Sequence, residues 1–342
     1  MPLFVLLFVS SALITAGVRA FLVRHGVMDL PNARSSHAVP VPRGGGVAIV
    51  AVFLSAVVWL LLKQAIPAKL VWALLGGGLA IAVVGLADDR FKLTPWPRLA
   101  VHSLAAAWAV WSLDSMRPLQ FGGGNSFGAW VSRGVAFIGL IWLTNLFNFM
   151  DGIDGLAGME AVCVSGLGAI LLFLNGLPSY ARVSSTLAAA SFGFLVWNWP
   201  PAKIFMGDVG SGFLGFTLGV LALFSSKAGP ELIWPWLILL AAFFVDATVT
   251  LLRRMFSRAR WYEAHRSHAY QHAAQATGSH AKVTLAVAVI NVGWLFPLAW
   301  AALRYPTAAP ALAAVAVIAL LYITIRFEGG LERHPSNAFL QD

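Results

Sequence analysis

The chain has 342 residues, of which 59% are hydrophobic and 11% are charged. Soluble globular domains carry roughly 25% charged residues, so this composition, with a mean hydropathy of +0.79, excludes a soluble enzyme and a disordered chain. The single cysteine, Cys163, rules out an internal disulfide and a cysteine-based metal site. The net charge is +9, but the basic residues stand at the ends of apolar segments, where membrane lipid headgroups explain them better than nucleic acid does.

Apolar segments long enough to cross roughly 30 Å of hydrocarbon follow one another along the chain. We expect about eleven transmembrane helices, and therefore an all-α polytopic helical bundle that forms one integral membrane domain over residues 1–342. Only the connectors 24–43 and 253–282 are extended, which leaves no room for a separate soluble domain. The approximate cores of the predicted spans are 2–22, 44–62, 70–87, 99–113, 134–150, 156–174, 183–199, 209–226, 232–252, 283–303 and 309–325.

The distribution of Lys and Arg orients this predicted bundle. The first apolar segment has no basic region before it and carries Arg19 and Arg24 at its end, which is typical of a retained span rather than a cleaved secretory signal. The connectors on one side, with the C-terminal tail, hold 15 basic residues, and those on the other side hold seven. The positive-inside rule therefore predicts an outside N-terminus and a cytoplasmic C-terminus.

Nearly every unusual polar cluster falls on the predicted cytoplasmic side. A transporter or flippase would instead place ionisable groups near the bilayer midplane, in two related halves, and the sequence shows no internal repeat. We therefore favour an enzyme working at the membrane surface, with a multi-span transporter as the alternative. The clusters are 34–46, the pair Asp88 and Asp89, 145–154, 203–212 and 253–272.

Asp88 and Asp89 end the third apolar segment. Adjacent carboxylates at a helix C-terminus face each other and the negative end of the helix dipole, so a positive group must offset them. Arg90 and Lys92 could do so at a solvated helix end. Alternatively, the pair belongs to a phosphate and Mg²⁺ site.

Two further segments combine carboxylates with glycines. In the string N-x-x-N-x-x-D-G-x-D-G-L, a spacing of three would place four polar side chains along one drifting helix face if the helix continues, while the glycines permit a tight exit. The four residues are Asn145, Asn148, Asp151 and Asp154. Burying such groups is costly unless they are paired, which favours binding of a nucleotide or a cation. Asp208 stands among glycines at the start of an apolar span, where backbone N–H groups favour phosphate, although small residues also serve helix packing.

Two basic segments carry the remaining candidates. His265 and His268 would share a face of a helix, and with Arg266 they could engage a pyrophosphate. No HExxH pattern occurs, so zinc binding is the weaker interpretation. Near the start of the second span, prolines and glycines hold His37 and Arg43 in a stiff frame that suits contacts with an anion or uracil.

Asp246 lies inside an apolar span, where a carboxylate is a functional candidate by default. Thr250 and Arg253 follow at roughly one-turn spacing, so the three side chains would form a ladder on one helix face. A structural ion pair between Asp246 and Arg253 is the alternative. Both interpretations stay open.

Together these motifs resemble the polyprenyl-phosphate N-acetylhexosamine-1-phosphate transferases of bacterial glycosyltransferase family 4. The resemblance rests on the pair Asp88 and Asp89, on the string at 145–156 and on the segment F-M-G-D-x-G-S at 205–211. Two positions depart from the family's pattern. The motif DDxxD has Lys92 in its fifth position, and the histidine motif, HxHH or HHH in the family, has Ser267 in place of a histidine. This form is most similar to the branch that initiates O-antigen synthesis.

The resemblance implies transfer of an N-acetylhexosamine 1-phosphate (GlcNAc, QuiNAc, FucNAc or similar) from a UDP-sugar to undecaprenyl phosphate, with release of UMP. It places the enzyme in the bacterial inner membrane with a cytoplasmic active site, at the start of O-antigen or other lipopolysaccharide synthesis, and implies Mg²⁺ or Mn²⁺ as cofactor. The peptidoglycan translocase branch is the nearer alternative, disfavoured by the missing HHH. The CDP-alcohol phosphotransferases are disfavoured because their D-G-x-x-A-R pattern is absent. The glycine-rich spans are compatible with a homodimer.

The resemblance also implies roles for individual residues. Asp208 would ligate the metal with Asp151 nearby, and Asp88 and Asp89 would position the lipid phosphate, which makes these four the expected catalytic set. Substrate-binding residues fall into three groups: His37, Asp154 and Phe205 at the uridine end; His265, Arg266 and His268 at the pyrophosphate; and Arg43, Asn145 and Asn148 beside them.

Overall fold

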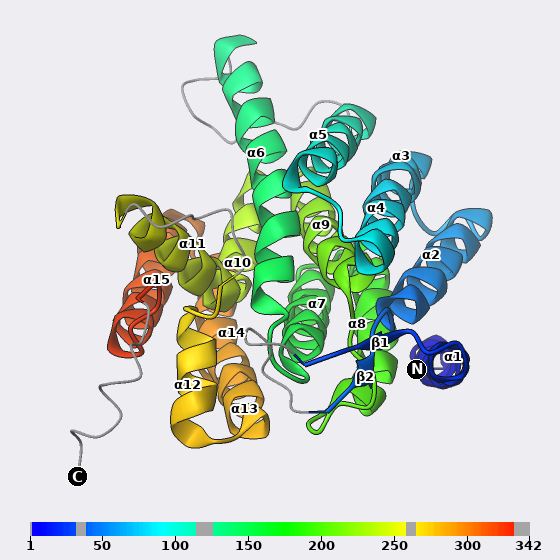
Figure 1. The fold of residues 1–342 in the computed structure, drawn as a ribbon. Helices are drawn as coiled ribbons and strands as arrows, with labels where there is room; N and C mark the ends of the chain where they lie inside the picture. The colour runs from blue at the N-terminus through cyan, green and yellow to red at the C-terminus, as the bar shows by residue number, and fades with distance from the viewer. Residues whose placement is uncertain (1, 32–38, 114–125, 258–264, 332–342) are drawn as a thin grey trace.

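The computed structural model describes residues 2–31, 39–113, 126–257 and 265–331. Within these ranges the chain is a helical bundle, as predicted, and its one sheet is a two-stranded antiparallel pair, β1 (Met28–Asp29) and β2 (Val41–Pro42) (Figure 1). The helices are α1 (Pro2–Arg24), α2 (Gly46–Leu62), α3 (Ala68–Trp72), η1 (Ala73–Gly77), α4 (Gly78–Phe91), α5 (Pro95–Ser112), α6 (Ser126–Met150), α7 (Leu156–Leu174), α8 (Pro178–Asn198), α9 (Asp208–Ser225), η2 (Pro230–Leu232), α10 (Ile233–Leu239), α11 (Ala241–Phe256), α12 (Ala269–Thr277), α13 (His280–Ile290), η3 (Asn291–Leu295), α14 (Phe296–Arg304), η4 (Pro306–Ala308) and α15 (Ala309–Arg326).

All eleven predicted apolar segments are helical. In the described part of the chain, seven helices are long and apolar enough to cross a membrane. Three of them include a short π-helix or 3-10 helix, namely η1, η3 or η4. An eighth, formed by η2 and α10 together with α11, is bent by 71°. The other three predicted spans correspond to α2, which has 17 residues, and to α5 and α8. The chain is a multi-pass membrane protein.

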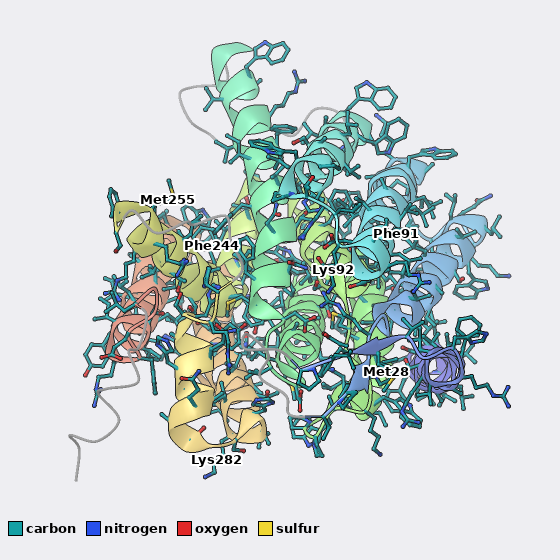
Figure 2. All side chains as sticks on the ribbon, viewed as in Figure 1. Met28, Phe91, Lys92, Phe244, Met255 and Lys282 are labelled. Carbon is teal, nitrogen blue, oxygen red and sulfur yellow. The ribbon has the colours of Figure 1, made fainter. Side chains whose placement is uncertain are left out.

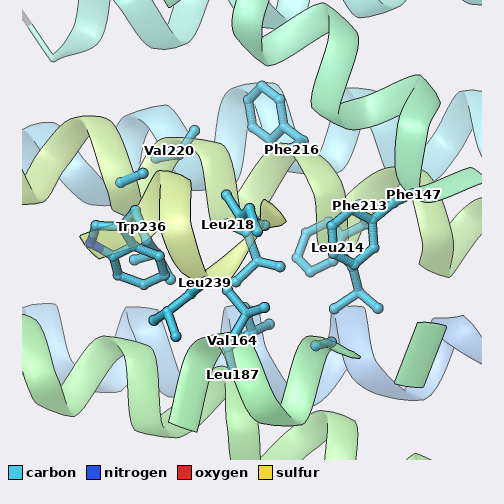
Figure 3. Packing of buried hydrophobic residues seen from close by; sticks show 14 of the residues in the cluster. Phe147, Val164, Leu187, Phe213, Leu214, Phe216, Leu218, Val220, Trp236 and Leu239 are labelled. Atoms are coloured by element: carbon cyan, nitrogen blue, oxygen red, sulfur yellow. The ribbon is translucent and has the colours of Figure 1, made fainter. Parts of the chain in front are cut away.

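Helix α9 is the centre of the bundle. All 18 of its residues are buried, and it contacts α2, α4, α6, α7, α8 and α10. Lipid is as apolar as a helix surface, so helices associate in membranes through close packing. A Cβ at Gly215 would overlap the carbonyl oxygen of Leu143 in α6, so glycine allows the two backbones to approach. Figure 3 shows Phe213, Leu214, Phe216, Leu218 and Val220 of α9 among Phe147, Val164, Leu187, Trp236 and Leu239 of its neighbours.

Three of the polar segments meet where α2 and α9 begin and α4 ends. A Cβ at Gly46 would overlap the backbone of Gly210, and a Cβ at Gly85 would lie 2.5 Å from the backbone oxygen of Asp208. The first turn of α9 therefore packs closely against the first turn of α2 and the last turns of α4. Charged side chains that follow or precede these turns are held close to one another.

Candidate functional site

Arg43, which follows β2, joins three carboxylates. Its Nε donates to Asp89 at 2.7 Å, its Nη2 pairs with Asp208, and its Nη1 donates to Asp29 at 3.5 Å. Burial opposes the charge on the guanidinium, but Asp208 and Asp89 outweigh that effect and raise the pKa of Arg43 above its ordinary value. Arg43 is therefore a fixed positive charge at the centre of the cluster.

The backbone around Phe205 sets the position of Arg43. Phe205 donates its N–H to the carbonyl of Pro42 at 2.8 Å, and its own carbonyl accepts from Gly44 and Gly45 at 3.1 and 2.9 Å. Gly44 has a φ of +119°, which favours glycine. The segment before α9 thus pairs with the segment after β2, and Phe205 contributes to the site through its backbone.

A second arginine, Arg98 in the first turn of α5, adds another positive charge to the cluster. Its Nη1 donates to Asp88 at 2.8 Å, and its Nη2 lies 3.3 Å both from Asp208 and from the Oδ1 of Asn148. Sequence reasoning missed Arg98. The acidic pair needed a cation, but Arg90 and Lys92 follow it more closely in the chain, so no local pattern singled out Arg98.

Asp89 fixes the start of α9. Its two carboxylate oxygens accept from the backbone N–H groups of Asp208 and Val209, at 2.9 and 3.2 Å. A carboxylate is stabilised there by the helix dipole and by N–H groups that have no partner within the helix. The expectation that these N–H groups bind phosphate is therefore corrected for the first two of them, because Asp89 occupies them.

Lys92, the departure from DDxxD, ends helix α4. Its backbone adopts the left-handed conformation with a φ of +51°, and its N–H donates to the carbonyl of Asp88 at 2.9 Å. The Oδ1 of Asp88 accepts from the N–H of Leu93 at 2.7 Å. The side chain of Lys92 is exposed, and its backbone, not its charge, ends the helix.

The helix does not continue through the string 145–154. It ends at Met150, as the predicted span 134–150 does, so the four polar side chains do not share one helix face. Asn148 does reach the cluster, since its Nδ2 donates to the Oγ of Ser211 at 3.2 Å in addition to the Arg98 contact. Asn145 donates instead to the carbonyl of Ile141 in its own helix at 2.7 Å.

Asp151 lies in the turn after α6. Burial raises the pKa of Asp151 well above its usual value, and the charges of Asp208, Asp89 and Asp154 raise it further, while Arg43 opposes them. Asp151 therefore lies within electrostatic reach of Arg43, Asp208 and Asp89.

Asp154, in the same turn, contacts α13 and the segment that follows α8. Its Oδ2 lies 3.3 Å from the Nδ1 of His280 and accepts from the N–H of Ala202 at 3.1 Å, while its carbonyl accepts from Thr284 at 3.0 Å. His280, which begins α13, is a second residue that sequence reasoning missed. No local pattern marks it, because its partner lies in a distant segment.

The histidine segment folds as a bend that leads into α12. The rings of His265 and His268 stack with centroids 5.0 Å apart, but His268 precedes the first residue of α12, so a bend and not a shared helix face brings them together. The Oγ of Ser267 lies 2.9 Å from the Nδ1 of His265. Burial, with the charges of His268 and Arg254, lowers the pKa of His265 to about 3. Arg266 is half-buried beside them.

Tyr270 connects the histidine segment to the turn that carries Asp151. Its hydroxyl donates to the carbonyl of Phe149 at 3.0 Å, and a Cβ at Gly152 would overlap that hydroxyl. The structure therefore brings every described candidate segment into one connected network. His37 lies outside the described residues.

Asp246 does not form the ion pair considered from the sequence. Thr250 donates to its Oδ1 at 3.1 Å, as the ladder predicts, but the Nη1 of Arg253 donates to the carbonyl of Gly329 at 2.8 Å. A further carboxylate within a span, Glu160 in α7, is fully buried and accepts from Asn291 at 2.7 Å.

A cavity of about 1330 Å³ opens beside the two arginines. Charged residues line one part of it, and apolar residues of α1 and α4 line another, which suits a ligand with an anionic head and a hydrocarbon tail. Met28, Phe91 and Lys92, labelled in Figure 2, belong to its lining. The charged lining residues are Asp29, Arg43, Asp88, Asp89, Arg90, Lys92 and Arg98.

The carboxylates of Asp88 and Asp208 fit an open Mg²⁺ site better than a metal site formed by protein ligands alone. In the described part of the chain, no group of three or more His, Cys, Asp or Glu side chains is arranged to hold a metal ion. Asp88 and Asp208, however, have carboxyl groups within hydrogen-bonding reach of each other. Mg²⁺ in proteins is typically held by one or two carboxylates together with substrate phosphates and water, and this pair supplies that number.

Comparisons with known proteins point to one group of enzymes. Residues 71–226 match the family model described as glycosyl transferase family 4. A Bacillus subtilis protein named "Probable undecaprenyl-phosphate N-acetylglucosaminyl 1-phosphate transferase" is 27% identical over 310 residues, 89% of this chain and 85% of that protein. The decaprenyl-phosphate N-acetylglucosaminephosphotransferase of Mycolicibacterium smegmatis is 32% identical over 271 residues, 70% and 65% of the two chains. The phospho-N-acetylmuramoyl-pentapeptide-transferase of Chlamydia muridarum is 32% identical over 210 residues, 53% and 60%.

Proposed function

Because the chain belongs to glycosyl transferase family 4, among the polyprenyl-phosphate hexosamine-1-phosphate transferases, we propose that it transfers an N-acetylhexosamine 1-phosphate from a UDP-sugar to undecaprenyl phosphate and releases UMP. The observation that carries this proposal is the pairing of Asp208 with both Arg43 and Arg98 at a cavity that also has apolar walls. One substrate is a soluble polyanion and the other is an anionic head on a lipid. The arginines of the cavity suit the anionic groups of both substrates, and its apolar wall suits the lipid tail.

In the proposed reaction, an oxygen of the lipid phosphate attacks the β-phosphorus of the UDP-sugar, and the bond to UMP breaks. Arg43 and Arg98 hold phosphate oxygens, since the planar guanidinium fork matches their geometry. Asp88 lines the cavity and orients the lipid phosphate beside them. A general base is not required there, because a phosphate monoester is already largely ionised at neutral pH.

A divalent cation belongs to this proposal, with Mg²⁺ first and Mn²⁺ as a substitute. Asp208 would hold it, with Asp88 in direct reach and Asp151 in the adjacent turn. When bound, such an ion neutralises charge on the phosphates and polarises the phosphoryl oxygen.

The remaining candidates would bind the rest of the donor. Asp154 and Phe205 would lie toward the uridine, and His265, Arg266 and His268 toward the pyrophosphate, where they offset charge on the departing UMP. Asn148 supports Arg98 and contacts Ser211, so its role is to orient the arginine. The histidine segment with Ser267 favours the O-antigen initiating branch, in the inner membrane with the site on the cytoplasmic face.

The test is release of UMP by the purified protein, supplied with undecaprenyl phosphate and Mg²⁺, from a panel of UDP-linked N-acetyl sugars. The panel includes the UDP-N-acetylmuramoyl-pentapeptide, because the Chlamydia muridarum relative acts on a phospho-N-acetylmuramoyl-pentapeptide. UMP release that requires both substrates is the expected result. Turnover of the pentapeptide donor alone would move the protein to the peptidoglycan branch, and absence of turnover with every donor would contradict the proposal.

A further inference from the structure

Asp246 in α11 receives four hydrogen bonds, and the proposed reaction assigns it no direct role. Its Oδ1 accepts from the N–H of Ala269 at 3.0 Å and from Thr250 at 3.1 Å, and its Oδ2 accepts from the N–H of Tyr270 at 3.0 Å. The Nδ1 of His268 lies 3.4 Å from Oδ1. The carboxylate is 8% exposed. A buried carboxylate persists only where its lone pairs are satisfied, and this one is fully satisfied by α12 and its neighbours.

The contact with His268 determines where that ring carries its proton. An ionised carboxylate is only an acceptor, so the Nδ1 of His268 must be the donor. The neutral ring is then the Nδ1–H tautomer, and its Nε2 presents a lone pair. Such a carboxylate partner fixes both the tautomer and the orientation of a functional imidazole. Stacking on His265 at 5.0 Å and on Tyr270 at 5.6 Å restricts the plane of the ring as well.

The two backbone contacts of Asp246 extend this control to the turn after α6. The residues whose N–H groups it accepts begin α12, so the carboxylate holds the start of that helix through hydrogen bonds and the helix dipole. Tyr270 then reaches Phe149, next to the turn that contains Asp151. Asp246 is thus connected both to His268 and, through Tyr270, to the turn that contains Asp151.

We propose that Asp246 is a positioning residue, which holds His268 as its Nδ1–H tautomer and holds α12 against the turn that carries Asp151. Its consequence for catalysis rests on the proposed function, whereas its effect on the tautomer does not. A carboxylate that only began helix α12 would leave the histidine tautomer free to change. The two roles are therefore separable by spectroscopy.

The experiment uses the full chain in lipid nanodiscs with ¹⁵N-labelled histidine. The His268 signal is assigned as the one lost in His268→Gln, and its two ring nitrogens report the tautomer. We expect a protonated Nδ1 in the wild type and, in Asp246→Asn, a shift toward the Nε2–H tautomer, because the amide offers one acceptor where the carboxylate offered two. Asp246→Glu keeps a carboxylate and should restore the Nδ1–H form at least in part.

Activity is measured on the same preparations. Loss of the carboxylate partner of a metal-bound histidine typically costs roughly 10- to 100-fold in metal affinity or activity. By analogy we expect kcat of Asp246→Asn to fall by roughly 10- to 100-fold, with a smaller change in KM for the UDP-sugar. Glu160→Gln is the matched control, since Glu160 is also a fully buried carboxylate within a span, paired with Asn291 at 2.7 Å. Its His268 signal should match the wild type.

An unchanged Nδ1–H signal in Asp246→Asn, or an Nε2–H signal in the wild type, overturns the proposal. If Asp246→Asn fails to fold, the wild-type and Asp246→Glu spectra still decide the tautomer. A wild-type protein without UMP release would defeat the proposed function, but it would leave the tautomer result intact.

Discussion

Arg98 and Asp208 form an ion pair of 3.3 Å between the first turns of α5 and α9. Asp208 also pairs with Arg43, so one carboxylate lies between two guanidinium groups that come from separate segments, one before α2 and one in α5. Two clustered arginines repel each other unless an anion separates them. Asp208 is that anion, and in the proposed reaction the phosphate groups of the substrates would share the same positive charge.

Replacing Asp208 with Asn should reduce UMP release by at least about 100-fold. The variant loses the carboxylate that pairs with both arginines and that is also the proposed metal ligand. The protein should still insert, since the packing of α9 depends on its apolar residues and glycines. UMP release in the presence of Mg²⁺ is the measurement, with membrane extraction and gel filtration as the test of folding. Near-native turnover would remove Asp208 from the proposed mechanism.

Arg98→Lys should retain only a small part of the activity, and Arg98→Ala less. The three donors of a lysine share one nitrogen, so they cannot span Asp88, Asp208 and Asn148 as the planar guanidinium does. We expect a loss of roughly 10- to 100-fold for the lysine variant, in line with about 1.4 to 2.8 kcal/mol of lost interaction. Arg182→Ala, at an exposed position on α8, is the control and should match the wild type. Equal activity of Arg98→Lys and wild type would show that charge alone suffices.

The comparison of Arg98 with Asp208 shows what the sequence can predict. Asp208 stands in a local pattern of glycines, and Asp88 and Asp89 stand together, so each is visible from its neighbours in the chain. Apolar segments of spanning length likewise predict the helices, because membrane thickness sets a minimum length. Arg98 and His280 have no local pattern, since their partners come from distant segments. The role of Asp89 at the start of α9 is equally invisible, because it depends on how α4 and α9 pack.

Ser267→His should not raise activity, although it restores the family's more common residue. Ser267 is 1% exposed, and its Oγ lies 2.9 Å from His265 and accepts from Arg254 at 3.4 Å. An imidazole is much larger than a hydroxymethyl group, so it would displace one of these partners and cost roughly 1–3 kcal/mol in packing. The measurements are UMP release and melting temperature. A clear gain in turnover would contradict the assignment to the branch that lacks this histidine.

Labelling of introduced cysteines tests the orientation predicted from the Lys and Arg distribution. Lys203 is exposed just before α9, and Lys63 is exposed at the opposite end of α2. The native Cys163 is buried, so its background reaction should be low. In intact cells an impermeant thiol reagent should label Lys63→Cys, whereas Lys203→Cys should react only after permeabilisation. The reverse pattern would place the site on the outer face of the membrane.

His265 predicts a loss of stability in mild acid. Its pKa is lowered from 6.5 to about 3 in the folded protein, chiefly by burial, with His268 and Arg254 adding to the effect. Between these values the unfolded chain binds a proton that the folded chain does not, so the free energy of unfolding rises with pH and levels off above about pH 6.5. The melting temperature in detergent, followed by tryptophan fluorescence, should therefore fall as the pH is lowered from 7.5 to 5. In His265→Gln the change between these two pH values should be smaller, because glutamine has no proton to gain. A slope that matches the wild type would show that the folded protein protonates His265 as readily as the unfolded chain does.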